Sequence, residues 1–220
     1  MRSEWAVAPE QQVKPRCRHF GECGGCDWQH IAYGEQLRLK SRMVERAVPR
    51  GVEVAATLPT PSPDGGTPGS AGEAPWGFRD KVSFVFGPGG RGKPLVMGHY
   101  RRGSRTILPV DECPVHAEAG NRFAFALRDA LARAHVEGAS PDGRIGIARY
   151  VVVRVSEDTG ELVGTLVATG NARALRRVTA DLDARLRPVA AGQGDRAGLP
   201  RRSPVAAGQG DRAGLPRRSP

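Results

Sequence analysis

Apolar residues recur at intervals of three and four in three stretches of the chain, as they do on the buried face of a helix. The first stretch covers residues 30–48 and is stopped by a proline and a glycine. The second covers residues 119–135 and is closed by Gly138, and the third follows Asn171, a residue type that caps helices. We therefore predict three amphipathic helices. The apolar face of the last one consists of Leu175, Val178, Leu182 and Leu186.

Other stretches alternate apolar with polar residues, which is the pattern of strands with one buried face. In residues 78–86 the apolar residues Val82, Phe84 and Phe86 alternate with polar ones. Further strands are predicted at residues 95–100, 105–110, 145–155 and 161–169. The predicted fold class is α+β, with a small cysteine-rich helical segment and a central domain in which helices pack on an antiparallel sheet.

Two stretches are too poor in large apolar residues to fold. Residues 188–220 read PVAAGQGDRAGLPRRS twice in succession, followed by a closing proline, and residues 59–75 hold five prolines and four glycines. We predict a cysteine-rich segment with a helix at 1–58, a flexible linker at 59–75, a central α+β domain at 76–187 and a disordered repeat at 188–220.

The 220 residues carry a net charge of +10, and 29 of the 33 basic residues are arginine. A basic surface favours polyanions such as nucleic acid, although an arginine-rich composition alone is weak support. No apolar run approaches the roughly 18 residues that cross a bilayer, and the N-terminal residues lack a signal-peptide core. We expect a soluble cytoplasmic protein with no membrane partner.

The four cysteines have an uneven spacing. Cys17, Cys23 and Cys26 follow a C-x5-C-x2-C pattern with two glycines in the loop, and Cys113 lies far along the chain before a proline. Such a loop can aim several sulfurs at one metal centre, and the remote thiolate can supply the fourth ligand. An iron–sulfur cluster is favoured; a structural zinc held by four thiolates, and ordinary thiols or disulfides, remain as alternatives.

Several motifs carry a family resemblance. The segment CRHFGECGGCDWQHIAYGEQLRLK resembles the cluster segment of the RumA-type RNA uracil-5-methyltransferases, and FRDKVSFVFG and GHYRRGSRTILPVDECPVH resemble their central domain. The resemblance spans about residues 16–186. It implies a 4Fe-4S cluster held by Cys17, Cys23, Cys26 and Cys113, S-adenosylmethionine (SAM) as methyl donor, and large-subunit ribosomal RNA as the partner.

The resemblance also implies a SAM-binding domain with a catalytic cysteine, which this sequence does not continue into. Its single G-x-G-x-x-G, at Gly87, Gly89 and Gly92, lies between two predicted strands and is predicted to be a hairpin turn. Methylation at carbon 5 of uracil requires a thiolate at carbon 6, and the cluster would occupy all four cysteines. We expect a truncated chain that has no SAM site or catalytic residue and transfers no methyl group by itself. The alternative is a non-catalytic four-cysteine module, with zinc or an iron–sulfur cluster, that binds RNA or a partner through its basic face.

Basic residues concentrate between positions 79 and 105, where Asp80 is the single acid. Arginine and lysine contact phosphates, and neighbouring aromatic residues stack on unpaired bases. The predicted RNA contacts are Arg79, Lys81, Arg101, Arg102 and Arg105.

The aromatic residues and histidines receive separate predictions. Phe78, Phe84 and Phe86 are expected in the core of the sheet domain. Trp28 and His30 are expected to cover the cluster, while His19 and His116 are expected to be hydrogen-bonding neighbours of the cysteines rather than ligands.

Overall fold

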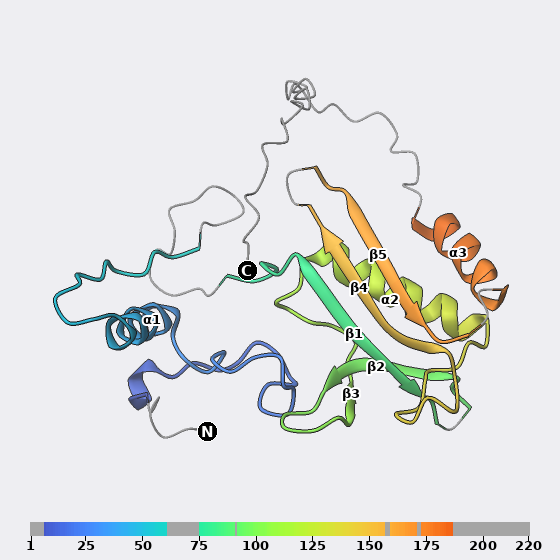
Figure 1. Ribbon diagram of the computed structural model, residues 1–220, viewed down its shortest axis with the longest axis horizontal. Helices are drawn as coiled ribbons and strands as arrows, with labels where there is room; N and C mark the ends of the chain where they lie inside the picture. Colours follow the sequence, from blue (N-terminus) through green and yellow to red (C-terminus); the bar gives the residue numbers. More distant parts are fainter. Residues whose placement is uncertain (1–6, 61–74, 91, 157–158, 171–172, 187–220) are drawn as a thin grey trace, which may run out of the picture. The chain divides into compact units, whose positions relative to one another are not determined.

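Five antiparallel strands form one sheet in the order β3-β2-β1-β4-β5 (Figure 1). The structure is a computed structural model that describes residues 7–60, 75–90, 92–156, 159–170 and 173–186. The strands are β1 (Lys81–Pro88), β2 (Leu95–Tyr100), β3 (Ile107–Pro109), β4 (Ala148–Val155) and β5 (Leu162–Ala168). The helices are the short 3-10 helix η2 (Pro9–Gln11), α1 (Tyr33–Ala47), α2 (Glu118–Arg133) and α3 (Arg173–Leu186).

This arrangement confirms the predicted α+β class and the approximate position of every predicted helix and strand. The predicted turn at Gly87, Gly89 and Gly92 is confirmed as well, because it joins β1 to β2 and opens no helix. A side chain at Gly89 would meet the backbone oxygen of Lys93 at 1.8 Å, which explains a glycine at that position. The predictions for the repeat, for most of the linker and for Asn171 lie outside the described residues.

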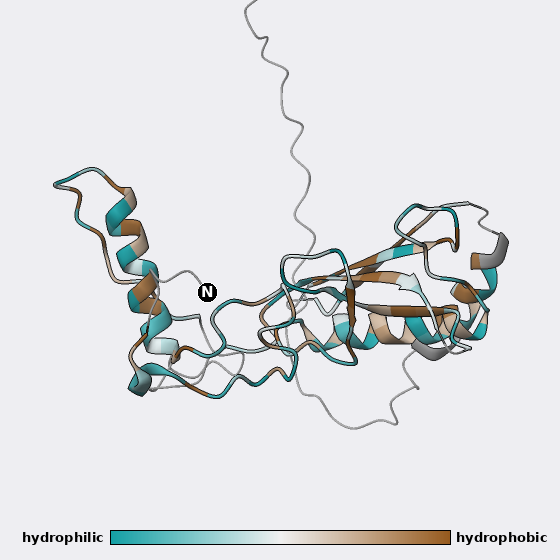
Figure 2. Cartoon of the chain, turned by 90° about the horizontal axis from the view of Figure 1, so that it is seen from below, coloured by the Kyte–Doolittle hydropathy of each residue, from teal (hydrophilic) through white to brown (hydrophobic). Residues whose placement is uncertain are grey.

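The core lies between one face of the sheet and helix α2, with α3 packed on α2 (Figure 2). Alternate residues of β1 and β4 point into it, and Val82, Phe84, Val151 and Val153 are fully buried there. Leu131 of α2 meets them from the helix side. None of the described helices is both long and apolar enough to cross a membrane.

The prediction for Phe78 is wrong, because this residue is 48% exposed. Phe84 and Phe86 are buried as predicted. Strand β1 begins only at Lys81. Before it, Arg79 donates its backbone N–H to the carbonyl of Val115 and forms an isolated bridge with the segment after β3. The strand alternation therefore does not extend back to Phe78.

The N-terminal segment ends in helix α1, whose first turn follows a bridge between Gln12 and Ile31. Ile31 and Leu39 are 1% and 2% exposed, so they form the buried centre of this segment. The chain after the helix folds back on it: the backbone N–H of Thr60 donates to the hydroxyl oxygen of Tyr33 at 2.8 Å.

Candidate metal centre at the cysteine loop

All four cysteines line one small cavity. Cys17, Cys23 and Cys26 come from the loop before α1, and Cys113 comes from the loop between β3 and α2. Cys23 and Cys113 are each 9% exposed, and the other two are half-buried. The fold thus brings together two segments that are about ninety positions apart in the sequence, as the cysteine pattern predicts.

Short backbone turns shape the cysteine loop. Phe20 donates its N–H to the carbonyl of Cys17 at 3.1 Å, and Cys23 donates to the carbonyl of His19 at 2.9 Å. Gly21 has φ +91°, a left-handed conformation that glycine adopts without strain. These turns fold the five residues between the first two cysteines back on themselves, so both sulfurs can line one cavity.

The loop that carries Cys113 is held from two sides. The carbonyl of Cys113 accepts hydrogen bonds from the side-chain amide of Asn121 at 2.9 Å and from the backbone N–H of His116 at 3.1 Å. The next residue, Pro114, accepts from the backbone N–H of Gly77 at 2.9 Å. Helix α2 and the segment before β1 therefore fix the position of the remote thiol.

Two arginines join the loop between β2 and β3 to the cysteine loop. Arg102 forms an ion pair with Asp27 at 2.5 Å and donates to the carbonyl of Cys26 at 2.7 Å, and Arg101 pairs with Glu22. The backbones pair too, because the N–H of Arg102 donates to the carbonyl of Glu22 at 2.7 Å. We call this set of contacts the arginine latch.

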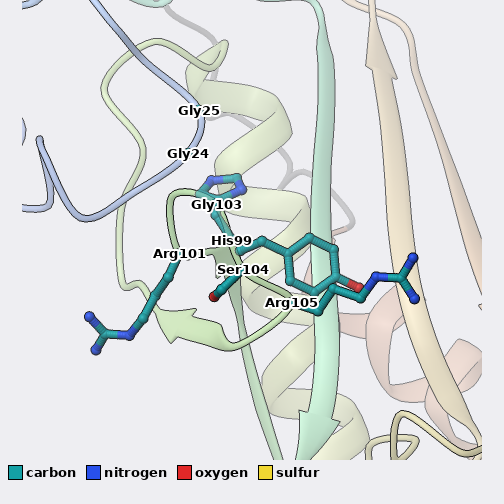
Figure 3. A pocket seen from close by; sticks show the side chains of 8 residues that line it. Gly24, Gly25, His99, Arg101, Gly103, Ser104 and Arg105 are labelled. Carbon is teal, nitrogen blue, oxygen red and sulfur yellow. The ribbon is translucent and has the colours of Figure 1, made fainter. Parts of the chain in front are cut away.

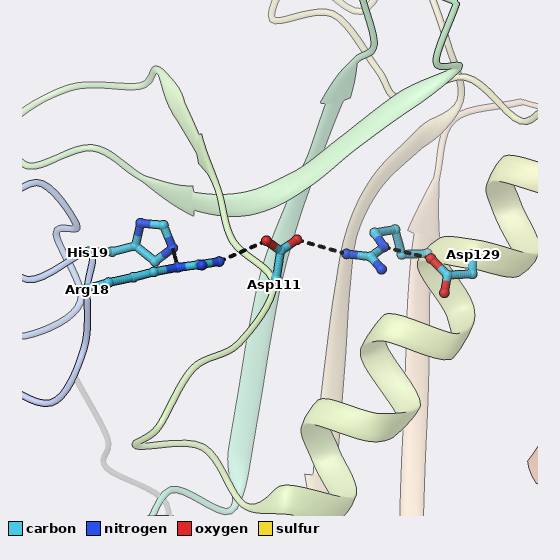
Figure 4. Close-up of polar contacts among 5 residues, drawn as sticks. Arg18, His19, Asp111 and Asp129 are labelled. Carbon is cyan, nitrogen blue, oxygen red and sulfur yellow. Dashed lines mark hydrogen bonds and ion pairs between the residues drawn. The ribbon is translucent and has the colours of Figure 1, made fainter.

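A second ion-pair group lies on another side of the cysteine loop (Figure 4). Asp111 forms ion pairs with Arg18 of the loop at 2.8 Å and with Arg128 of α2 at 3.6 Å. Arg128 also forms an ion pair with Asp129. Exposed ion pairs contribute about 0–1 kcal/mol each to the free energy of unfolding. These pairs therefore add little stability, and their main effect is to join the cysteine loop to the sheet domain.

Burial governs the protonation of the groups in the cavity. It raises the pKa of the Cys113 thiol to about 11, and the neighbouring cysteines add to the rise. Burial also raises the pKa of Cys17. The same cause lowers the pKa of His99 to about 4 and that of His116 to about 3, so both imidazoles are neutral at pH 7.

The two imidazoles lie directly beside the remote thiol. One ring nitrogen of His99, one of His116 and the Cys113 sulfur lie within 4.8 Å of one another. Phe84 packs against both rings, with centroid distances of 4.7 Å to His99 and 5.2 Å to His116. The Nε2 atom of His99 is buried and has no hydrogen-bond partner among the described residues.

The described residues contain one group of three or more ligand atoms within 4.8 Å of one another, and it consists of His99, Cys113 and His116. Cys17, Cys23 and Cys26 line the same cavity but lie outside that group.

The predicted RNA contacts fall into three environments. Arg79 lines the cysteine cavity, Arg101 and Arg102 form the arginine latch, and Lys81 and Arg105 are exposed with no carboxylate within 4.0 Å among the described residues. The structure does not bring all five together on one surface. Their contact with RNA stays a prediction, which Lys81 and Arg105 suit best.

Arg105 belongs to an open groove of about 690 Å³ between the cysteine loop and the turn after β2. Figure 3 shows Arg101 and Arg105 extending in opposite directions, with the His99 ring turned toward the Gly24–Gly25 segment. The groove is lined by Gly24, Gly25, His99, Tyr100, Arg101, Gly103, Ser104 and Arg105. It is large enough for a nucleotide.

The structure also places the aromatic residues predicted near the cluster. The aromatic side chain that lines the cavity beside the cysteines is Phe20, and the ring of His30 packs against it at 5.3 Å. Trp28 is not among the lining residues. His99 was predicted beside the RNA-contacting stretch and not in the cysteine cavity, although its place in the alternation of Leu95 and Met97 puts it on the buried side of β2.

The sequence is similar to those of two bacterial RNA methyltransferases. The chain is 32% identical over 169 residues to an RNA methyltransferase of Thermosynechococcus vestitus, matching 73% of this chain and 33% of the relative. An RNA methyltransferase of Geobacter sulfurreducens is 31% identical over 160 residues, matching 70% of this chain and 30% of the relative. Both relatives are described as uncharacterised. This chain belongs to the same RNA methyltransferase family as these relatives.

The chain spans about a third of the length of the methyltransferase relatives it matches. A solved structure, the Pyrococcus abyssi tRNA (uracil-54, C5)-methyltransferase in complex with S-adenosyl-L-homocysteine, shares the fold with a TM-score of 0.50 and 23% identity. That likeness covers 69% of this chain and 33% of the Pyrococcus chain. No protein-family model matches the sequence.

Proposed function

We propose that this chain is the cluster-bearing and RNA-positioning part of a SAM-dependent RNA uracil-5-methyltransferase that acts on large-subunit ribosomal RNA. One observation carries the proposal. In this chain, which is similar to RNA methyltransferases, the four cysteines come from two distant segments and line one cavity. In this proposal Cys17, Cys23, Cys26 and Cys113 hold a 4Fe-4S cluster.

The proposed cluster would supply a covalent tie and a site for electron transfer when bound. The chain's own residues do the rest. The buried Cys113 fixes the sheet side of the centre, Phe20 limits the access of water, and the neutral His99 and His116 pack against the sulfur without adding charge.

The methyl-transfer chemistry is assigned elsewhere in this proposal. Carbon 5 of uracil becomes a nucleophile only after a thiolate adds at carbon 6, and all four cysteines of this chain line the metal cavity. The nucleophile and the SAM site then belong to the two thirds of the relatives' length that this chain does not match.

Anaerobic purification tests the metal assignment directly. We expect about four iron and four sulfide per chain and a broad visible absorbance that reduction bleaches. One zinc per colourless chain would replace the proposal with the alternative of a four-cysteine zinc module. Titration of four free thiols in a metal-free, folded chain would refute both metal assignments.

The arginine latch gives a prediction for metal retention. Arg102→Ala removes the ion pair with Asp27 and the hydrogen bond to the Cys26 carbonyl. These exposed contacts are together worth about 1 kcal/mol, so iron should leave for a chelator roughly fivefold faster. Arg144→Ala is the matched control, since that arginine forms an exposed ion pair with Asp142, at 3.5 Å, and has no ion pair with the cysteine loop among the described residues. Equal release rates for the two variants would contradict a role for the latch.

The groove gives a prediction for RNA binding. Arg105→Gln removes one exposed cation that no described carboxylate neutralises, so it should lower the slope of log affinity against log salt by about 0.7 for single-stranded RNA. Fluorescence anisotropy with a ribosomal RNA fragment at several salt concentrations measures this slope. Arg144→Gln serves as the control with an unchanged slope. If Arg105→Gln leaves the slope unchanged, the groove does not contact phosphate.

A further inference from the structure

One face of the sheet has no covering element among the described residues. Helices α2 and α3 lie on the opposite face, where the core is (Figure 2). Side chains alternate between the two faces of a strand, so the residues between the core positions point outward. The outward positions include Lys81, Ser83, Val85, Tyr100, Tyr150, Val152, Arg154, Val163 and Thr165. We call these residues the open face.

The open face exposes aromatic and apolar groups. Tyr100 is 44% exposed, Tyr150 42% and Val163 63%. An exposed aromatic ring offers a flat apolar face on which another ring can stack. A binding partner that carries flat, partly apolar groups therefore fits the open face.

The charge of the open face is of one sign. Lys81 and Arg154 are paired across β1 and β4, and neither has a carboxylate within 4.0 Å among the described residues. No outward position within the five strands is acidic. Two described acids flank the strands: Asp80 precedes β1, and Glu161 precedes β5 and accepts a hydrogen bond from the hydroxyl of Thr159. The face therefore suits a polyanion better than an ordinary protein surface.

The strand register sets the spacing of the two tyrosines. Val85 of β1 lies opposite Gly98 of β2 on one side and opposite Tyr150 of β4 on the other. Tyr100 follows Gly98 by two residues, so the two tyrosines lie diagonally across β1. Strand spacing and rise put their backbone positions about 12 Å apart, which is too far for one base to contact both.

We propose that the open face binds unpaired nucleotides of RNA, with Tyr100 and Tyr150 each stacking on one base and Lys81 and Arg154 contacting phosphates. This inference rests on the proposed function, because it assumes that RNA is the partner. Stacking on exposed aromatic rings next to basic residues is the usual mode by which proteins hold single strands. The Arg105 groove adjoins Tyr100, so the groove and the open face form one continuous RNA surface.

The test uses the full iron-loaded chain and two RNA probes, a single-stranded ribosomal oligonucleotide and a perfect duplex that contains the same strand. Tyr150→Ala should weaken binding of the single strand about 5- to 150-fold, because stacking contributes about 1–3 kcal/mol per base. Tyr150→Phe keeps the ring and should bind like the unaltered chain. Tyr150 is exposed, and equal iron content and melting temperature will show that each variant is folded.

Each other outcome overturns the inference in a distinguishable way. Unchanged binding by Tyr150→Ala, with the Arg105→Gln slope reduced, would keep the proposed function and refute stacking on the open face. Equal weakening with single strand and duplex would refute recognition of unpaired bases. Loss of binding by Tyr150→Phe as well would show that the ring does not act by stacking. No binding of either RNA by the unaltered chain would overturn both the inference and the RNA part of the proposed function.

Discussion

Replacing Cys113 with serine should reduce the iron content of the chain from about four atoms to less than about one. The remote cysteine is the only one of the four that comes from the sheet domain, and its loop is fixed by Asn121 and Gly77. A serine hydroxyl is a harder and less acidic group than a thiol and is a poor ligand for iron in a cluster. Without this thiolate, the cluster would keep three ligands, all of them from the cysteine loop.

Loss of the cluster should also lower stability, because metal binding to a site formed by folding contributes to the folding free energy. The melting temperature of Cys113→Ser should therefore match that of the unaltered chain after iron removal. Iron and sulfide analysis, visible absorbance and thermal unfolding under anaerobic conditions measure these effects.

A control separates the thiol from the environment of its loop. Val115→Thr places a hydroxyl at a site that is 5% exposed in the same loop and leaves all four thiols intact. It should keep nearly full iron despite some loss of stability. Full iron content in Cys113→Ser, with an unchanged melting temperature, would remove this cysteine from the metal site.

Phe84→Ala should lower the free energy of unfolding by about 3–5 kcal/mol, a large share of the total stability of about 5–15 kcal/mol of an ordinary domain. Phe84 is fully buried and packs against the rings of His99, His116 and Phe125. It therefore joins the core to the wall of the metal cavity. Its removal leaves a cavity and frees two imidazoles, so iron should also be released faster.

Denaturant unfolding of the iron-loaded chain measures the first effect, and iron transfer to a chelator measures the second. Phe78→Ala is the matched control, because this phenylalanine is 48% exposed and its loss should cost less than about 1 kcal/mol. Similar losses for the two variants would mean that Phe84 does not support the cavity wall.

Local patterns predicted the fold well because each strand and helix buries one face. The alternation of Val82, Phe84 and Phe86 marks β1 correctly, since all three point into the core. The same reasoning failed for Phe78, where the chain is irregular and pairs with the segment after β3. Such pairing depends on residues far along the chain, which local spacing does not encode.

The candidate site was predictable where chemistry requires rare residues at fixed spacing. The three-plus-one pattern of the four cysteines predicted that they lie together around one metal group; the structure brings all four to the lining of one cavity, and the metal group stays a proposal. The roles of the arginines were less predictable, because Arg102 meets Asp27 across 75 positions of sequence. The proposed role of Tyr150 was not predictable either, because it resembles any exposed strand residue until the register places it diagonally from Tyr100.

The wide sequence separation between the cysteine loop and its partners has a consequence during synthesis. Arg18 pairs with Asp111 across 93 positions, and Cys113 lies a further two residues on. At about 5–20 residues per second, a ribosome needs roughly 5–20 s to travel from the loop to these partners. Three thiols therefore emerge well before the fourth, with neither the latch nor the sheet to shield them. Insertion of the proposed cluster with all four ligands must therefore await the synthesis of Cys113, which precedes β4 and β5.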